Sequence, residues 1–307
     1  MNDYLILILG LAAAGAGGEL FVGGAVGLAQ WAHVPAGIIG ATIAAFATSS
    51  PEFAVSVGAS LEGKPQIALG DALGSNVVNV ALVLGIALLF SKLKATRDSI
   101  RRDFPVAALA PILTGILLID GELSRIDGIV MLSVFLAWLV AVIFEVRKSR
   151  SAVEKVLGET NRLYVVLSAI GGLGLLVLAG RLIVTGAKSI ALSYGFEEFV
   201  IGATVVAVGT SIPELATVII SKFRGHEEIG LGTVLGSNIF NNFWIVSVAT
   251  LIAPMKGLPL RELAVGLGFG LLTVLIIIPS REGIIGRSRG GILLVLYAAY
   301  VVTILQQ

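Results

Sequence analysis

The sequence contains no cysteine and only two histidines among its 307 residues. The absence of cysteine excludes a disulfide framework, a thiolate nucleophile and a thiolate metal site, and two histidines leave little for an imidazole metal site. Charged residues are also scarce, at 13%, and a net charge of +1 gives no support for a nucleic-acid partner.

Apolar residues are abundant instead. Hydrophobic residues make up 56% of the chain, glycine occurs 38 times, and the mean hydropathy is +0.98, far above that of a soluble globular protein. A bilayer core needs roughly 20 apolar residues per helix, and the segment that begins with Met1 reads as a retained span. We predict ten spans: 3–30, 36–59, 66–91, 104–120, 126–146, 163–193, 198–221, 228–253, 260–279 and 286–305.

The longest charged stretch separates the first five spans from the last five, and we take residues 147–162 as the linker. An odd number of spans makes the second half enter the membrane from the opposite side. We therefore expect an all-α membrane protein of ten transmembrane helices, built as two inverted five-helix repeats, 1–146 and 163–307.

Loop charge predicts the orientation. If the spans alternate in direction, the loops on one side carry 15 Lys or Arg residues and those on the other side carry 4. The positive-inside rule then puts both termini outside and the linker in the cytoplasm of a cell whose plasma membrane holds the protein.

One block occurs twice. Residues 40–54 read GATIAAFATSSPEFA and residues 202–216 read GATVVAVGTSIPELA. A second block follows each copy, GDALGSNVVN ending at Asn79 and GTVLGSNIFN ending at Asn241. Each residue of the first copy aligns with the residue 162 positions later in the second copy, and no gap is needed. Such a register indicates an internal duplication.

Both copies break an apolar span with proline. Pro51 and Pro213 cannot donate a hydrogen bond to the carbonyl four residues back, so carbonyl groups around Ala47 and Gly209 are freed. Broken helices are tolerated in membranes where they are buried in protein or line a wet cavity. The adjacent oxygen-bearing residues are Thr48, Ser49 and Glu52 in the first copy and Thr210, Ser211 and Glu214 in the second.

The third and eighth spans add more oxygen atoms. Ser75 and Asn79 are four residues apart, as are Ser237 and Asn241, so each pair projects from one helix face. We expect helices 2, 3, 7 and 8 to be broken at the centre of the protein. Carboxylates, amides, hydroxyls and freed carbonyls are the ligands that hard cations such as calcium and sodium select. The two copies therefore predict a cation site halfway through the membrane.

Each feature also has an ordinary explanation. A proline in a transmembrane helix is usually a kink, glycine spacing usually serves packing, and serine or threonine often bonds to its own helix. A buried glutamate can reach the interface or make a structural hydrogen bond. The recurrence of all of them at the same offsets in both halves favours the cation site. A cation channel could use the same oxygen atoms, whereas an enzyme is not expected.

The repeated TSxPE and GSNxxN blocks resemble those of the sodium/calcium exchanger family of cation/calcium antiporters, and the resemblance covers essentially the whole chain. It implies antiport of sodium against calcium by alternating access. Glu52 and Glu214 would be the carboxylate ligands that calcium and sodium share. It further implies backbone carbonyl ligands at Thr48, Thr210, Ala45 and Ala207, hydroxyl ligands at Ser49, Ser75, Ser211 and Ser237, and amides at Asn79 and Asn241 that close the centre. Transported calcium and sodium and the lipid bilayer are then the partners, with no cofactor and no obligatory protein partner.

Two departures from the family pattern bear on the transported ions. Ala47 stands where the family usually has glycine, and Asn241 stands where potassium-dependent relatives carry aspartate. The first would stiffen the break, and the second indicates independence from potassium. The Thr-Ser pairs favour sodium over protons as the driving ion, and a proton/calcium antiporter is the alternative.

Three further charges have open roles. Glu19 and Arg181 occupy matched positions in the first and sixth spans, where they either pair or reach the interface or a vestibule. Asp71 precedes Ser75 by one turn and either draws cations toward the site or compensates the dipole of its helix.

Overall fold

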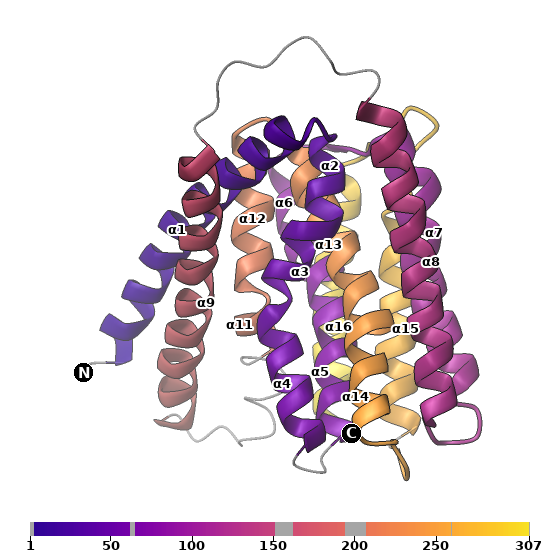
Figure 1. Cartoon of the computed structure of the whole chain (residues 1–307). Coiled ribbons are helices and arrows are strands. Elements are labelled where there is room, and N and C mark those ends of the chain that lie inside the picture. Colours follow the sequence, from indigo (N-terminus) through magenta and orange to yellow (C-terminus); the bar gives the residue numbers. More distant parts are fainter. Residues whose placement is uncertain (1–2, 62–64, 151–161, 194–206, 259, 307) are drawn as a thin grey trace. The chain divides into compact units, whose positions relative to one another are not determined.

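The computed structural model describes residues 3–61, 65–150, 162–193, 207–258 and 260–306, and most of them are helical (Figure 1). The middle of the expected linker, 151–161, and the first part of the expected seventh span, 198–206, lie outside these ranges. The described chain divides into two compact units. The first unit holds Met1–Thr48 and Val142–Val234, and the second holds Ser49–Ala141 and Leu235–Gln307. Each unit thus combines segments from both sequence halves.

Helices of the first unit occupy the expected apolar stretches. They are α1 (Asp3–Ala32), α2 (Ala36–Ile39), the π-helical η1 (Gly40–Ala44), α3 (Ala45–Thr48), α9 (Arg162–Ser193), α11 (Ala207–Thr210), α12 (Ile212–Phe223) and most of α13 (Glu227–Ile239). In Figure 1, α1 and α9 lie side by side, and contacts between them extend along both helices.

Elements of the second unit follow the same pattern. They are α4 (Ser50–Leu61), α5 (Pro65–Val77), the π-helical η2 (Val78–Leu84), α6 (Gly85–Phe90), β1 (Leu93–Lys94), α7 (Arg97–Leu117), most of α8 (Arg125–Arg150), the end of α13, the π-helical η4 (Phe240–Ile245), α14 (Val246–Ile252), α15 (Leu260–Ile276), β2 (Ile284–Ile285) and α16 (Ser288–Leu305). The two short strands pair antiparallel, with Leu93 opposite Ile285.

Several helices are apolar enough to cross a bilayer. Within the described ranges, four are long enough as well: Asp3–Trp31, Ala68–Phe90, Arg125–Arg147 and Glu227–Ile252. Three shorter helical stretches are also apolar: Ala36–Thr48, Leu163–Ala179 and Ser288–Ile304. This composition agrees with the membrane protein that the hydropathy predicts.

Glycine lets α1 and α9 approach closely. A methyl group added at Gly24 would lie 2.5 Å from the Ala169 amide nitrogen, and one added at Gly172 would lie 2.4 Å from the Phe21 amide nitrogen. Neither position can hold a larger side chain unless the backbones separate. Such small-residue contacts are a common basis for helix association in membranes, where van der Waals packing replaces the hydrophobic effect.

We expect Gly24→Ala to destabilise the first unit. Forcing an extra methyl into a packed contact costs about 1–3 kcal/mol, and here the obstructing atoms belong to the backbone of α9. The melting temperature of the protein in detergent should fall by several degrees. Gly15→Ala is the matched control on the same helix, because nothing lies within 4 Å of its added methyl. Equal melting temperatures for the two variants would contradict this account of the contact.

The second and seventh spans are interrupted at equivalent serines. Ser49 separates α3 from α4, and Ser211 separates α11 from α12. Pro51 and Pro213 fall in the first turn of the helix that follows, where an amide hydrogen is not needed. The prolines therefore lie at the start of new helices, and the second and seventh spans are interrupted as we expected.

The third and eighth spans differ from our expectation of a break. The path from α5 through η2 to α6 stays helical, as does the path from α13 through η4 to α14. Each span instead winds into a π-helix, at Val78–Leu84 and Phe240–Ile245. Wide π-turns inside α-helices are frequent at functional sites, because they change the direction in which side chains project.

Two ionic contacts were not expected from the sequence. In the second unit, the buried carboxylate of Asp103 pairs with the Arg102 guanidinium at 2.7 Å and accepts a hydrogen bond from Trp138 Nε1 at 3.1 Å, which joins α7 to α8. In the first unit, Glu19 pairs with Arg224. The proposed pairing of Glu19 with Arg181 is therefore wrong, and the exposed Arg181 side chain fits the alternative that it reaches an interface or a vestibule.

Candidate cation site

The two repeated glutamates occupy equivalent local positions. Glu52 lies in the first turn of α4 in the second unit, and Glu214 lies in the first turn of α12 in the first unit. Both side chains are 0% exposed. The amino end of a helix favours a negative charge, so both breaks create a place where a buried carboxylate is tolerated.

The residues next to each break are also largely buried. In the first unit, Thr48 Oγ1 donates to the Ala45 carbonyl at 3.3 Å, so that carbonyl is already engaged. Ser211 is buried, and its Oγ has no hydrogen-bond partner among the described residues. Thr210 is partly exposed, and Ala207 starts α11. Ser49, at the corresponding break in the second unit, is buried.

The second unit brings half of the predicted ligands onto elements that contact one another. Helix α4 packs against α5 and η4, and α5 packs against η4. These three elements, with η2 and the end of α13, carry Glu52, Ser75, Asn79, Ser237 and Asn241, and Ser49 directly precedes α4. All six side chains are buried. Segments about 160 residues apart in the sequence therefore meet within one compact unit, as the duplication predicts.

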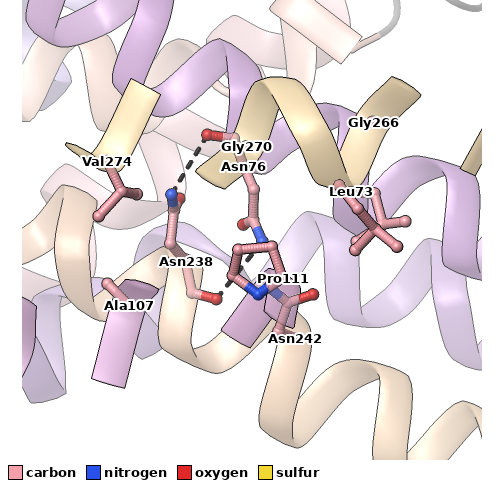
Figure 2. Close-up of a pocket in the computed structure, with 10 residues that line it drawn as sticks. Leu73, Asn76, Ala107, Pro111, Asn238, Asn242, Gly266, Gly270 and Val274 are labelled. Carbon is pink, nitrogen blue, oxygen red and sulfur yellow. Dashed lines mark hydrogen bonds between the residues drawn. The ribbon is translucent and has the colours of Figure 1, made fainter. Parts of the chain in front are cut away.

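An asparagine network joins the two GSN blocks. Asn79 Nδ2 donates to Asn238 Oδ1 at 3.3 Å, and Asn241 Nδ2 donates to Asn76 Oδ1 at 3.0 Å. Asn238 Nδ2 donates to the Asn76 carbonyl at 3.2 Å, and Asn76 Nδ2 donates to the Asn238 carbonyl at 3.5 Å. Figure 2 shows the last two bonds as dashed lines between Asn76 and Asn238. Each bond has a counterpart in which the two halves exchange roles.

This network determines which atoms of Asn79 and Asn241 remain available. Their amide nitrogens are engaged, while the Oδ1 atom of each is buried and has no hydrogen-bond partner within the described part of the chain. The Ser75 hydroxyl oxygen is buried in the same way. A buried acceptor without a donor costs about 1–3 kcal/mol. Oxygen atoms of this kind are possible ligands of a hard cation.

Asn76 and Asn238 were missed from the sequence as functional candidates. Both follow a predicted serine ligand directly, and they correspond to each other by the same offset of 162 residues. That correspondence was the available signal, because a polar side chain repeated inside an apolar span needs a buried partner. Their role is to hold the amides of the neighbouring asparagines, and the sequence did not indicate this contact.

A small cavity lies beside the network in the second unit. Asn76, Asn238 and Asn242 line it together with residues of α7 and α15, as Figure 2 shows. Its volume is about 10 Å³. This is about the space of one water molecule. None of the residues that line it is acidic, so a cation there would lack a counter-charge and its burial would be costly.

The predicted ligands combine acidic and neutral oxygen atoms. Over the described ranges, no three side chains of histidine, cysteine, aspartate or glutamate gather into a metal-binding group. Among the predicted ligands only Glu52 and Glu214 are acidic, and the others would contribute neutral oxygen atoms. Calcium and sodium accept such neutral oxygen ligands, whereas zinc usually takes histidine or thiolate ligands.

Comparison with known proteins places the chain in a family. The family model described as sodium/calcium exchanger protein matches residues 3–144 and 164–306. The sodium/calcium exchanger MaX1 of Methanosarcina acetivorans is 30% identical, and the match covers 98% of each chain. Inner membrane protein YrbG of Escherichia coli (strain K12) is 35% identical over 81% of this chain and 79% of its own length.

Solved structures give the same result. The sodium-calcium exchanger NCX_Mj, in a structure soaked with 10 mM Na⁺ and 10 mM Sr²⁺, matches this chain with a TM-score of 0.82 at 30% identity, over 98% of this chain and 99% of the other. A structure of NCX_Mj soaked without Na⁺ and Ca²⁺ matches with a TM-score of 0.81. Since the family model covers both halves of the sequence, the protein belongs to the sodium/calcium exchanger family.

Proposed function

We propose that this protein exchanges sodium for calcium across the membrane by alternating access. Glu52 and Glu214 are the shared carboxylates, and one calcium ion or several sodium ions neutralise them in turn. Both sets of ions cannot occupy the same carboxylates together, so the binding of one displaces the other. This competition couples the two fluxes without any chemical step.

The asparagine network is the observation that carries the proposal furthest. It holds the amide nitrogens of Asn79 and Asn241 and leaves their buried Oδ1 atoms without a donor in the described chain. Two matched oxygen atoms from the two sequence halves are thereby presented inside a single compact unit. Such preorganised oxygen atoms suit a hard cation that must shed its water shell.

The remaining ligands are assigned by position in the repeated blocks. Ser49, Ser75, Ser211 and Ser237 contribute hydroxyls, and Thr48, Thr210, Ala45 and Ala207 contribute backbone carbonyls. Thr48 and Thr210 lie directly before the interruptions at Ser49 and Ser211. Convergence of Glu52 and Glu214 on one ion is part of this proposal.

Family membership makes the chain a membrane transporter and not an enzyme, and transport of this kind uses no cofactor. The names of MaX1 and NCX_Mj support sodium and calcium as the exchanged ions. The Thr-Ser pairs at both breaks favour sodium as the driving ion. A proton/calcium antiporter with the same fold and the same two glutamates is the second candidate, since the carboxylates could also bind protons.

We propose the arrangement in the membrane from the loop charges. Two inverted five-helix repeats, 1–146 and 163–307, would place both termini outside and the linker 147–162 in the cytoplasm of a cell whose plasma membrane holds the protein. An inward sodium gradient would then drive calcium out of the cell. We expect the exchange to be electrogenic, with net positive charge moving opposite to calcium.

Calcium uptake into reconstituted vesicles tests the function. Vesicles loaded with sodium and diluted into sodium-free buffer should take up radioactive calcium, while vesicles that carry only a pH gradient should not. An interior-positive potential should accelerate uptake, because net positive charge leaves as calcium enters. Uptake driven by the pH gradient but not by sodium would contradict sodium/calcium exchange and identify the proton/calcium antiporter.

A further inference from the structure

Asp71 is an acidic residue that the proposed site does not use. Helix α5 begins at Pro65, so Asp71 lies beyond its first turn, where compensation of the helix dipole is weak. The residue is partly exposed, yet its Oδ2 atom is buried and has no hydrogen-bond partner among the described residues. Compensation of the dipole, one of the two roles considered from the sequence, therefore does not account for this carboxylate.

Asp71 shares a helix face with two of the proposed ligands. Asp71, Ser75 and Asn79 follow one another at intervals of four residues along α5 and the start of η2. Each contributes a buried side-chain oxygen that lacks a hydrogen-bond partner within the described chain. At 1.5 Å per residue, the three form a row roughly 12 Å long. The carboxylate, the hydroxyl and the amide oxygen therefore follow one another along one helix face.

The corresponding position in the other sequence half has neither a carboxylate nor open space beside it. Thr233 stands at the position of Asp71, is fully buried, and donates its hydroxyl to the Ile229 carbonyl at 2.9 Å. A methyl group added at the neighbouring Gly232 would lie 2.6 Å from the Gly37 carbonyl oxygen. Nothing lies within 4 Å of a methyl added at Gly70, the neighbour of Asp71. The duplication is therefore asymmetric at this position, in charge and in packing.

We propose that Asp71 is an outer binding position for a divalent cation and loads the central site from one side of the membrane only. This inference rests on the proposed function and on the inverted repeat, which would place positions 71 and 233 toward opposite membrane surfaces. The carboxylate of Asp71 and the hydroxyl of Ser75 are oxygen ligands of the kind calcium prefers. The loading side is the one at which α5 begins.

The test is the calcium dependence of exchange measured separately from each side of proteoliposomes of known orientation. In Asp71→Asn, the KM for calcium should rise roughly tenfold on the side where α5 begins, because a fixed charge concentrates cations near a site. The maximal rate and the KM on the opposite side should stay unchanged. The separate variant Asp71→Glu should have the KM of the unaltered protein, since it keeps the negative charge. The effect should shrink at high ionic strength.

Two results would overturn the inference. An unchanged KM on both sides would show that Asp71 does not attract calcium, and an equal rise on both sides would show that it acts on the central site. Glu282→Gln, at an exposed turn in the second unit, is the control for general loss of surface charge. The unaltered protein is measured in the same vesicles. If it did not exchange sodium for calcium, the proposed function would be contradicted, independently of the role of Asp71.

Discussion

Sodium-driven calcium uptake should fall to background when either Glu52 or Glu214 is replaced by glutamine. One calcium ion carries two positive charges, so loss of one carboxylate leaves a net charge in a buried site. Removing one partner of a buried ion pair costs about 3–5 kcal/mol, which corresponds to a roughly 100- to 5000-fold loss of affinity. Glutamine keeps the shape of the side chain, so the effect comes from the charge.

The assay needs evidence that both variants still fold. Gel filtration and melting temperature in detergent should be close to those of the unaltered protein, since glutamine fits the same volume. Glu282→Gln, an exposed position, should retain full uptake. Undiminished uptake in either Glu52→Gln or Glu214→Gln would remove that residue from the site, and undiminished uptake in both would refute the proposed mechanism.

Replacement of Asn76 or Asn238 by leucine should weaken calcium binding, although neither residue is a proposed ligand. Asn238→Leu removes the acceptor of Asn79 Nδ2, and Asn76→Leu removes the acceptor of Asn241 Nδ2. Each buried donor left without a partner costs about 1–3 kcal/mol. The freed amide can also turn its Oδ1 away from the ion. We expect the calcium affinity to fall roughly 5- to 150-fold, which is the range that 1–3 kcal/mol corresponds to.

The pseudo-symmetry of the network makes this prediction specific. The two variants should weaken binding to a similar degree, because their bonds correspond one to one. Isothermal titration of calcium into the purified protein measures the affinity directly. Asn242→Leu is the matched control, since Asn242 lines the adjacent cavity and its Oδ1 makes no hydrogen bond within the described chain. A loss in Asn242→Leu as large as that in Asn238→Leu would contradict a specific role for the network.

Local signals made much of the architecture predictable. Apolar stretches of sufficient length identified the helices, and proline near Ser49 and Ser211 indicated where two of them are interrupted. The same signals misjudged the third and eighth spans, which wind into π-helices without a break. A π-turn depends on how a helix packs against its neighbours. Neither span contains a proline that could have indicated it in the sequence.

Ion pairs were less predictable, because a charge finds its partner through the fold. Glu19 pairs with Arg224, about two hundred positions away, although Arg181 occupied the matched position in the repeat. Asp103 combines a neighbouring arginine with Trp138 from the next helix. Spacing along the chain contains no information about such contacts unless both residues lie on one helix.

The sequence by itself determined the duplication, the apolar spans and the acidic and hydroxyl residues that recur in both halves, because composition, helix length and proline chemistry are local properties. Only the tertiary structure decided which polar atoms are engaged and which remain available. Asn76 contacts Asn238 across 162 residues of sequence, and their Oδ1 atoms accept hydrogen bonds from the amide nitrogens of Asn241 and Asn79. The Oδ1 atoms of Asn79 and Asn241 have no hydrogen-bond partner among the described residues. Hydrogen-bond pairing inside an apolar core depends on positions in space, which the order of residues does not specify.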